Sequence, residues 1–320
     1  MNKKKNNIKI INQLIKIKIL NANLKIKVKL LIIIIFCFIE IKIRRRESKL
    51  KVLICTIAKE ENKYINEFVA QYRRMKIKKI ILYDNNDING EKFDDILKND
   101  INNHFIEIIN IRGIKQPQTM ALNDCYQKNN KSYEWIAFYD IDEFLYIKHY
   151  HNLNTFLSLS KFKKCQSILI NWKYYGDNDK LYYEPKPLKQ RFIKEFPIEK
   201  LKTKKYYYSA SKTIVRGGLT LNWAHLPHYI SNVINCKPDG SINKNYFSPP
   251  QFSIAYIKHY ITKSTEEFIE RINRGDVIIK INNNYIKERI NNYYFLFNPK
   301  TREKLNLFQQ KVKYIKNVKL

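Results

Sequence analysis

The sequence predicts an α/β protein built on a sheet with parallel strands. Short apolar runs that fit buried strands alternate with segments in which apolar residues recur at helical spacing. Three of these runs end in polar clusters, at residues 59–62, 84–87 and 140–143. The carboxyl ends of parallel strands meet at one edge of a sheet, where open α/β sheets bind their ligands. The three clusters are therefore expected to border one crevice.

The predicted elements follow in the order strand, helix, strand, strand, helix, strand. The strands are expected at residues 51–57, 80–83, 106–111 and 135–139. A helix follows the first strand, and its apolar face comprises Ile65, Phe68, Val69, Tyr72 and Met75. The second helix is expected over residues 118–126.

Beyond a further strand at 167–172, the pattern becomes irregular and rich in Tyr, Pro and Lys up to about residue 250. Such a stretch favours loops built onto the sheet over a second independent domain. Residues 264–267, Ser-Thr-Glu-Glu, form a capping box that opens a helix with Phe268 and Ile272 on one face. The tail from residue 282 to 320 is expected to form basic helices.

The net charge of +31 would by itself suggest an anionic partner such as nucleic acid or a membrane surface. Residues 1–51 carry 12 Lys, 3 Arg and 2 Glu, so much of the excess lies in the first sixth of the chain. Only 12 of the 60 basic residues are Arg, which is the better residue for contacts with phosphates and bases. Nucleic acid is therefore not an expected partner.

The amino-terminal segment contains ten uninterrupted apolar residues, 30–39, flanked by Lys and Arg. A bilayer span needs about 20 largely apolar residues, and the wider window 24–43 includes four Lys and one Glu. The segment could be a weak signal-anchor, a basic interfacial segment or a stretch outside the working protein. Membrane association is expected, at the cytoplasmic face or through a single-pass anchor, with a cytoplasmic protein as the alternative. The predicted divisions are 1–49, 50–275 and a basic extension at 276–320.

The five cysteines are far apart in the sequence and include no C-x-x-C pair. They are Cys37, Cys55, Cys125, Cys165 and Cys236. Such spacing speaks against a zinc site and against a disulfide framework. We therefore expect buried thiols in a reducing compartment.

Asp140 and Asp142 follow the fourth predicted strand in the run Asp140-Ile141-Asp142-Glu143. Residues two apart on an extended chain share a face, so both carboxylates are expected to point into one crevice. A hard cation such as Mg2+ or Mn2+ binds one or two carboxylates together with phosphate oxygens and water. A cation held there could neutralise the charge on a departing diphosphate. Alone, the pair is equally typical of a solvated acidic turn.

Further motifs surround this pair in a fixed order. They are Ile57-Ala58-Lys59-Glu60-Glu61, Leu82-Tyr83-Asp84-Asn85-Asn86, Gln118 with Ala121-Leu122-Asn123-Asp124-Cys125, the run from Trp135 to Leu145, Lys212-Thr213-Ile214-Val215-Arg216, and His259-Tyr260-Ile261-Thr262-Lys263-Ser264 with Glu267-Phe268. Together they resemble glycosyltransferase family 92 and its relatives among the family 2-like enzymes. The resemblance covers about residues 50–275.

The resemblance implies a GT-A fold, an α/β nucleotide-binding sheet with a C-terminal helical, loop-rich acceptor region. It also implies inversion at the anomeric carbon and a divalent cation, Mn2+ or Mg2+, bound by Asp140 and Asp142. His259 stands where such folds often supply a late metal ligand, and His225 and His228 compete for that role. The residues implied to lie near the nucleotide are Thr56, Glu60, Asp84, Asn123 and Asp140.

An inverting transferase also needs a general base near the acceptor hydroxyl, usually Asp or Glu. The irregular region offers Asp177, Asp179, Glu184 and Glu195, and the sequence does not single out one of them. Asp177 and Asp179 follow a stretch, 172–176, that resembles a Trp-x-x-Phe-Gly motif of the family. Several aromatic side chains could stack on sugar faces or pack in the core, namely Trp172, Tyr174, Tyr175, Trp223 and Tyr229. Lys212 and Arg216 could touch phosphates, but isolated basic residues in this composition are mostly expected to be solvated.

The function predicted from these features is an inverting, metal-dependent hexosyltransferase. Its donor would be a nucleotide sugar and its acceptor a glycan or a lipid-linked molecule. Two other classes stay open at this point. One is a hydrolase or nucleotidyltransferase with the same acidic metal site, and the other is a basic membrane- or nucleic-acid-binding protein without catalysis.

Overall fold

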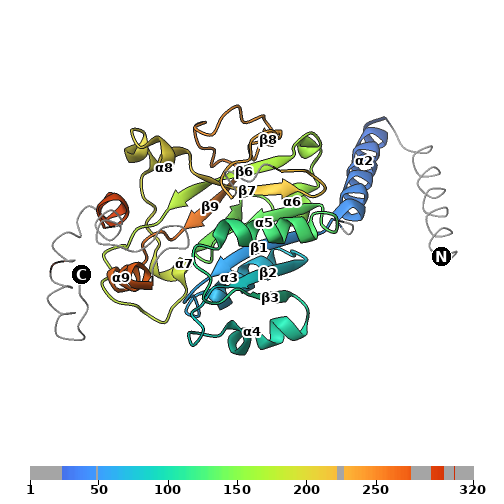
Figure 1. Ribbon diagram of the computed structural model, residues 1–320. Helices are drawn as coiled ribbons and strands as arrows, with labels where there is room; N and C mark the ends of the chain where they lie inside the picture. Colours follow the sequence, from blue (N-terminus) through green and yellow to red (C-terminus); the bar gives the residue numbers. More distant parts are fainter. Residues whose placement is uncertain (1–23, 48–49, 222–226, 275–289, 299–305, 307–320) are drawn as a thin grey trace. The chain divides into compact units, whose positions relative to one another are not determined.

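The computed structural model describes residues 24–47, 50–221, 227–274, 290–298 and 306. The chain divides into two compact units, Met1–Lys49 and Leu50–Leu320, each of which is described by itself (Figure 1).

The described part of the first unit is helix α2, Leu24–Glu47, which is 24 residues long. Most of its described apolar side chains are exposed, including Leu31, Ile33, Phe36 and Phe38. No helix among the described residues has both the length and the apolar character needed to cross a membrane.

The second unit contains a sheet whose first half is parallel, as predicted. Its strands run in the spatial order β3, β2, β1, β4, and all three neighbouring pairs are parallel. They are β1 (Val52–Ala58), β2 (Lys79–Asp84), β3 (Ile106–Asn110) and β4 (Trp135–Phe138). All four were expected from their apolar runs, and each lies within a residue or two of its expected bounds.

The other half of the sheet is mixed, so the expectation of a parallel sheet is wrong there. β7 runs antiparallel to β4 and β6, β9 runs parallel to β6, and β5 closes the sheet antiparallel to β9. A short strand, β8, also pairs with β6. These strands are β5 (Glu143–Ile147), β6 (Ser167–Tyr174), β7 (Ser211–Arg216), β8 (Asn235–Cys236) and β9 (Ala255–His259). Only β6 was predicted.

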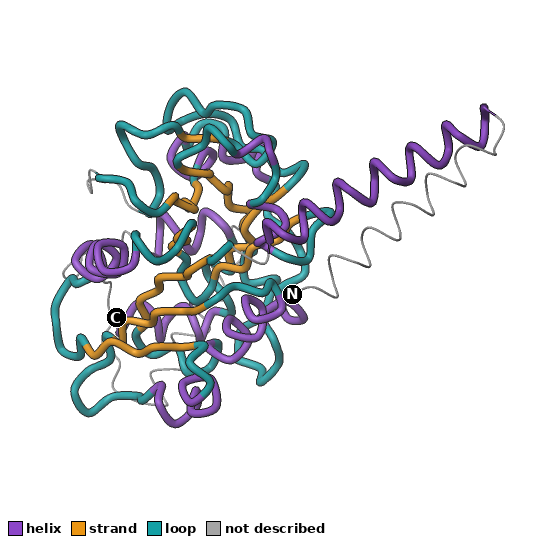
Figure 2. Tube along the Cα trace, turned by 90° about the vertical axis from the view of Figure 1, so that its right-hand side faces the viewer, coloured by secondary structure: helices purple, strands orange, loops and turns teal. Residues whose placement is uncertain are grey.

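Helices cover both faces of the sheet. α3 (Ile65–Arg74) and α4 (Phe93–Asn102) share one hydrophobic cluster with Val52, Ile54 and Trp135. α5 (Gln118–Asn129) shares a second cluster with the alternate strand residues Leu53, Cys55 and Ile136. Figure 2 shows the strands crossing the middle of this unit with helices on either side. The sequence predicted α3 and α5 but not α4.

The remaining helical elements are connected by loops. They are α6 (Leu153–Leu157), η1 (Ser160–Phe162), α7 (Leu188–Arg191), η2 (Ile198–Leu201), α8 (Lys205–Ser209), α9 (Thr265–Arg274), η4 (Ile290–Tyr294) and α11 (Phe295–Phe297). Three short ones, α7, η2 and α8, lie in the region that was predicted to be irregular. α9 begins at the predicted capping box: the backbone N–H of Glu267 donates to Ser264 Oγ, and that of Ser264 donates to Glu267 Oε2. Most of the predicted basic tail lies outside the described residues.

The structure joins four of the cysteines in two disulfides, Cys55–Cys125 and Cys165–Cys236. The prediction that no disulfide forms is therefore wrong, and the inference of a reducing compartment loses its basis. All four of these cysteines are buried, as expected, whereas Cys37 is exposed, so the expectation of a buried thiol is wrong at that position. The pairs escaped prediction because their members are 70 and 71 residues apart in sequence and meet only when β1 packs on α5 and β8 pairs with β6.

Candidate functional site

The Asp140–Asp142 pair lies in the short connection between β4 and β5, at the carboxyl end of the parallel strands. Tyr139 and Ile141 are buried in the core, and residues 141–142 form a turn in which the Glu143 N–H donates to the Asp140 carbonyl oxygen, so the pair does not lie on an extended strand as expected. The side chain of Asp140 is 38% exposed, whereas that of Asp142 is buried. The two carboxylates contact different partners, which makes them distinct parts of the site.

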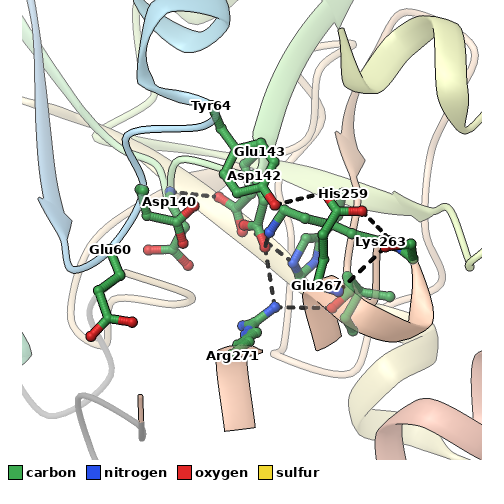
Figure 3. Close-up of polar contacts among 12 residues, drawn as sticks. Glu60, Tyr64, Asp140, Asp142, Glu143, His259, Lys263, Glu267 and Arg271 are labelled. Atoms are coloured by element: carbon green, nitrogen blue, oxygen red, sulfur yellow. Dashed lines mark hydrogen bonds and ion pairs between the residues drawn. The ribbon is translucent and has the colours of Figure 1, made fainter. Parts of the chain in front are cut away.

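Asp142 is surrounded by nitrogen atoms from β9, from α9 and from the loop between them (Figure 3). His259 Nε2 lies 3.7 Å from its Oδ1, while Lys263 Nζ and Arg271 Nη1 lie 3.3 Å and 3.2 Å from its Oδ2. Burial by itself would raise the pKa of Asp142, but the adjacent cations hold the pKa well below its usual range. The carboxylate is therefore charged at neutral pH.

His259 is the last residue of β9, and its ring packs against Trp172 at 4.4 Å between ring centroids. Burial lowers the pKa of His259 to about 3, although Asp142 acts in the opposite direction. The imidazole is therefore neutral at pH 7, which is the form that binds metals. The charge of Asp142 is consequently balanced by Lys263 and Arg271 and not by His259.

Asp140 belongs to a second cluster with Lys212 of β7 and Glu143 of β5. Lys212 is only 1% exposed, and its Nζ lies 2.7 Å from Asp140 Oδ2 and 3.6 Å from Glu143 Oε1. Burial raises the pKa of Glu143 well above its usual range, and Asp140 is the closest carboxylate to the Lys212 ammonium. The expectation that Lys212 is a solvated surface residue is wrong. Arg216, at the end of β7, donates to the carbonyl oxygens of Cys165 and Phe162.

A third cluster surrounds Glu267 on α9. Arg191 donates to its two carboxylate oxygens at 2.7 and 2.8 Å, and the Tyr64 hydroxyl donates to Oε1 at 2.6 Å. Both members of the Arg191–Glu267 pair are buried. Burial would raise the pKa of Glu267, but Arg191, Ser264 and Tyr64 lower it to about 2. This bidentate pair fixes α9 to the rest of the domain.

A cavity of about 230 Å³ lies beside these clusters, between the loop after β1 and α9. Its walls are formed by Glu60, Glu61, Lys63, Tyr64, Glu91, Lys263, Glu267, Glu270, Arg271 and Arg274. Arg274 holds the two sides together, because it donates to the carbonyl oxygens of Lys59 and Glu60 and to the Glu61 carboxylate. Glu60 and Lys263 both have left-handed backbones, with φ of 51° and 56°. Such conformations are strained for residues other than glycine and concentrate at ligand sites.

The residues expected near the nucleotide lie in different surroundings. Glu60 is exposed and lines the cavity, whereas Thr56 is buried in β1 and its Oγ1 has no hydrogen-bond partner among the described residues. Asp84 ends β2, and its buried carboxylate accepts from Arg112 Nε at 2.8 Å and from Asn86 Nδ2 at 2.8 Å. Asn123 lies on α5, partly buried, and its Oδ1 is also unpartnered within the described residues.

The candidate bases Asp177 and Asp179 line a second cavity, of about 280 Å³, with Phe196 and Lys200 among its walls. Asp177 is buried and accepts hydrogen bonds from the backbone N–H of Asp179 and from the Tyr294 hydroxyl. The other two candidates are in ion pairs: Glu184 with Lys180 and Lys186, and Glu195 with Lys173.

The competing histidines and the aromatic candidates are divided between the core and the undescribed part of the chain. His225 and Trp223 lie outside the described residues. His228 Nδ1 is 2.8 Å from the Ser211 carbonyl oxygen, and its ring packs against Trp172. Three of the candidates for sugar stacking are buried, namely Trp172, Tyr174 and Tyr175. Tyr229 is partly buried and contacts Tyr246.

Within the part of the chain that the structure describes, no three His, Cys, Asp or Glu side chains form a ready metal-binding group. Asp142 and His259 face each other, but Asp140 is drawn toward Lys212. The sequence placed Lys263 and Glu267 in a family-like motif without giving them a role at the site, and it did not single out Arg271 or Arg191. The helical spacing of Glu267, Arg271 and Arg274 on α9 was the one available signal, since residues three and four apart share a helix face.

The model of glycosyltransferase family 92 matches residues 49–302, and the chain belongs to this family. The family is one of glycosyltransferases, the first of the three classes that the sequence left open.

Solved glycosyltransferases show a distant likeness to this chain. The S. aureus enzyme TarS is 13% identical with a TM-score of 0.37, over 76% of this chain and 40% of TarS. A fragment of TarS in complex with UDP is 15% identical with a TM-score of 0.30, over 42% and 38% of the two chains. The mannosyltransferase PcManGT from Pyrobaculum calidifontis, with GDP-Man and Mn2+, is 10% identical with a TM-score of 0.31, over 38% and 35%. This chain thus spans well under half the length of these three structures. No curated protein matches the sequence.

Proposed function

We propose that this family 92 enzyme transfers a hexose from a nucleotide sugar, with inversion, to a glycan or lipid-linked acceptor, and that a divalent cation at Asp142 binds the donor diphosphate. The observation that carries the proposal is the pair formed by Asp142 and neutral His259. A carboxylate and an unprotonated imidazole lie side by side at the carboxyl end of the parallel strands.

The donor atoms of this pair fit a cation such as Mn2+ or Mg2+. Asp142 Oδ1 and His259 Nε2 are 3.7 Å apart, which is too long for a hydrogen bond. Two ligands that each lie roughly 2.1 Å from one ion can be up to about 4.2 Å apart, so the separation suits a shared cation. We propose Asp142 and His259 as protein ligands and Asp140, with its partly exposed carboxylate, as the third.

Other residues of the site would orient the nucleotide. Glu60 lines the cavity beside Asp142 and is the proposed contact on the nucleoside side. Asp84 would act indirectly, since its carboxylate orients Arg112, whose guanidinium also donates to the Glu91 carbonyl oxygen. Thr56 and Asn123 remain proposed contacts with unused side-chain oxygens. When bound, the cation would neutralise charge on the leaving diphosphate.

The test is thermal unfolding of the whole chain with MnCl2, with UDP or GDP, and with each nucleotide and MnCl2 together. The proposal predicts that one nucleotide with Mn2+ raises the Tm more than the two ligands do separately. Asp142→Ala should abolish that joint shift. Asp87→Ala serves as the control, because this exposed aspartate follows β2 and pairs only with Lys59 among the contacts described.

A wild type that shows no joint shift with either nucleotide would contradict the proposal, as would a shift that survives in Asp142→Ala. A panel of nucleotide sugars with Mn2+ would then identify the donor by its hydrolysis. Nuclear magnetic resonance of the product's anomeric proton would test inversion.

We also propose that α2 associates with a lipid surface. Its apolar side chains from Leu30 to Phe38 are mostly exposed, and the sequence on both sides of this run is basic. Such a segment gains apolar burial at a bilayer interface together with attraction to anionic headgroups. Co-sedimentation with vesicles of phosphatidylcholine and phosphatidylserine should depend on residues 24–47, and equal sedimentation of a chain lacking them would refute this.

A further inference from the structure

We propose that Lys263 and Arg271 are exchangeable counter-ions: they neutralise Asp142 while the site is empty, and they transfer to the donor diphosphate when a divalent cation takes their place. This inference rests on the proposed function and assigns to two residues a role in coupling the cation to the diphosphate.

The first argument comes from the geometry of the contacts. Charge-assisted N–H···O bonds are usually about 2.7–2.9 Å long. Lys263 Nζ and Arg271 Nη1 instead lie 3.3 and 3.2 Å from Asp142, and both approach the same oxygen, Oδ2. The nearby Arg191–Glu267 pair, with two separate bonds of 2.7 and 2.8 Å, shows what a fixed pair looks like in this domain. The contacts of Asp142 are looser and therefore easier to exchange.

The second argument is position. Lys263 and Arg271 both belong to the wall of the 230 Å³ cavity, so each lies between Asp142 and a space where a ligand fits. Lys263 Nζ also lies 4.7 Å from the centre of the Tyr64 ring. This cation–π contact stabilises the ammonium group when it no longer contacts the Asp142 carboxylate. The left-handed backbone of Lys263 costs free energy that its surroundings must offset, as is typical of residues held in place to bind ligands.

The remaining charges of the cavity wall are largely engaged with one another. Glu61 pairs with Arg274, Glu270 with Lys63, and Glu267 with Arg191. Glu91 accepts from the backbone N–H of Asn62. Glu60 faces the cavity as an exposed carboxylate, and its pKa is raised by burial of part of the group. The cations that border Asp142 are thus the pair best placed to meet an incoming anion.

The third argument is charge balance. Two cations, Lys263 and Arg271, already contact the single carboxylate of Asp142. A divalent cation added alone would bring further positive charge into a buried setting, where like charges repel strongly. A diphosphate brings several negative charges that Lys263 and Arg271 can meet directly. The cation and the diphosphate should therefore bind far better together than separately.

Isothermal titration calorimetry tests this with MnCl2 alone, and with UDP or GDP at saturating MnCl2, on the full chain. Lys263→Met removes the charge and keeps the length of the side chain. With a competitor of the metal gone, the Kd for Mn2+ alone should fall by about tenfold. With a phosphate ligand gone, the Kd for the nucleotide in the presence of Mn2+ should rise by about tenfold. Changes of opposite sign would not arise from a merely structural role.

The matched control is Lys63→Met, which removes a Lys from the same cavity wall but one that pairs with Glu270. It should leave the Kd for Mn2+ alone unchanged. Arg271→Gln, at a position whose side chain is 36% exposed on α9, provides a second test should Lys263→Met unfold. It should show the same pair of opposite changes.

Each outcome decides a separate point. Weaker binding of both Mn2+ and nucleotide in Lys263→Met and Arg271→Gln would overturn the exchange while leaving the proposed function intact. A wild type that binds Mn2+ as tightly without nucleotide as with it would also overturn the exchange and leave the proposed function intact. A wild type that binds neither ligand, even jointly, would overturn the proposed function together with this inference.

Discussion

Two carboxylate clusters lie close together at the α9 end of the domain, and they are built in opposite ways. Glu267 accepts four hydrogen bonds, from Arg191, Tyr64 and the Ser264 backbone, and the three from side chains are 2.6–2.8 Å long. The nearest charged groups of Asp142 lie 3.2–3.7 Å away. Both carboxylates are buried.

The difference in contact length distinguishes the Arg191–Glu267 pair, which has a structural role, from the contacts of Asp142, which we assign to ligand binding. A carboxylate whose oxygens are fully used by fixed donors contributes to the position of α9 and has no capacity for a ligand. A carboxylate with loose, shared contacts retains that capacity. The same helix therefore carries both the anchor, at Glu267, and a ligand contact, at Arg271.

The largest expected effect is on activity, from Asp142→Asn. This change keeps the size of the side chain and removes the charge that would hold the cation. Turnover should fall at least a thousandfold, on the order of 4 kcal/mol of transition-state stabilisation. Glycosyl transfer assays on purified protein, checked for fold by circular dichroism, measure this. Asp87→Asn, the exposed counterpart, should leave turnover unchanged. Near-normal turnover in Asp142→Asn would show that Asp142 is not a binding residue.

Arg191→Met should cost about 3–5 kcal/mol of unfolding free energy, because it leaves the buried Glu267 carboxylate without its counter-ion. Urea unfolding of the variant and the wild type measures the loss. Adding Glu267→Gln to Arg191→Met should recover part of it, since the uncompensated charge is then gone. A loss below about 1 kcal/mol would place the pair among weak surface contacts.

The two clusters should also respond differently to pH. The pKa of His259, about 3, lies below the unfolded value of 6.5, so its contribution to stability is present above pH 6.5 and is lost as the pH falls toward 3. At pH 5 this loss amounts to about 2 kcal/mol. The pKa of Glu267, about 2, lies below its usual 4.5, so its contribution is constant from pH 7 to 5 and is lost only at lower pH.

Unfolding free energies at pH 7 and pH 5, in the absence of metal, measure this difference. His259→Gln should lose less stability over that interval than the wild type, by about 2 kcal/mol. An identical pH dependence of the two proteins would show that His259 is not held in its neutral form by burial.

The smallest effect is expected from Lys63→Met, which breaks the Lys63–Glu270 pair on the same cavity wall. Both side chains are substantially exposed, at 35% and 50%, so solvent screens the attraction. The loss of unfolding free energy should be below about 1 kcal/mol. A larger loss in urea unfolding would mean that exposed and buried pairs of this wall contribute alike.

The parallel half of the fold could be predicted from the sequence because each of its strands is one short apolar run. In the mixed half β6 could be predicted, but β7 and β9 could not, since they contain lysines, as in Ser211-Lys212-Thr213 and Tyr256-Ile257-Lys258. These strands are formed by pairing with β4 and β6, and not by their own composition. α4 was missed because its buried residues are only Phe93 and Leu97, among acidic and polar neighbours.

The same limit applies to the site. Asp140 and Asp142 stand out because two carboxylates follow a strand, which is a local pattern. Their partners are not local: Lys212 is 72 residues from Asp140, and Lys263 and Arg271 are 121 and 129 residues from Asp142. A buried lysine in a lysine-rich chain has no distinguishing sequence feature, and its role becomes visible only once the sheet is assembled.

The two disulfides follow one another along the chain without interlacing, since Cys55–Cys125 is complete before Cys165 begins the second. The first bond can therefore form in a growing polypeptide before the second stretch has been synthesised, and the second bond can form without rearrangement of the first. A chain produced in a reducing cytosol would carry four buried thiols in their place. We expect secretion into an oxidising compartment to yield the more homogeneous protein, and free-thiol titration under denaturing conditions should then find only Cys37.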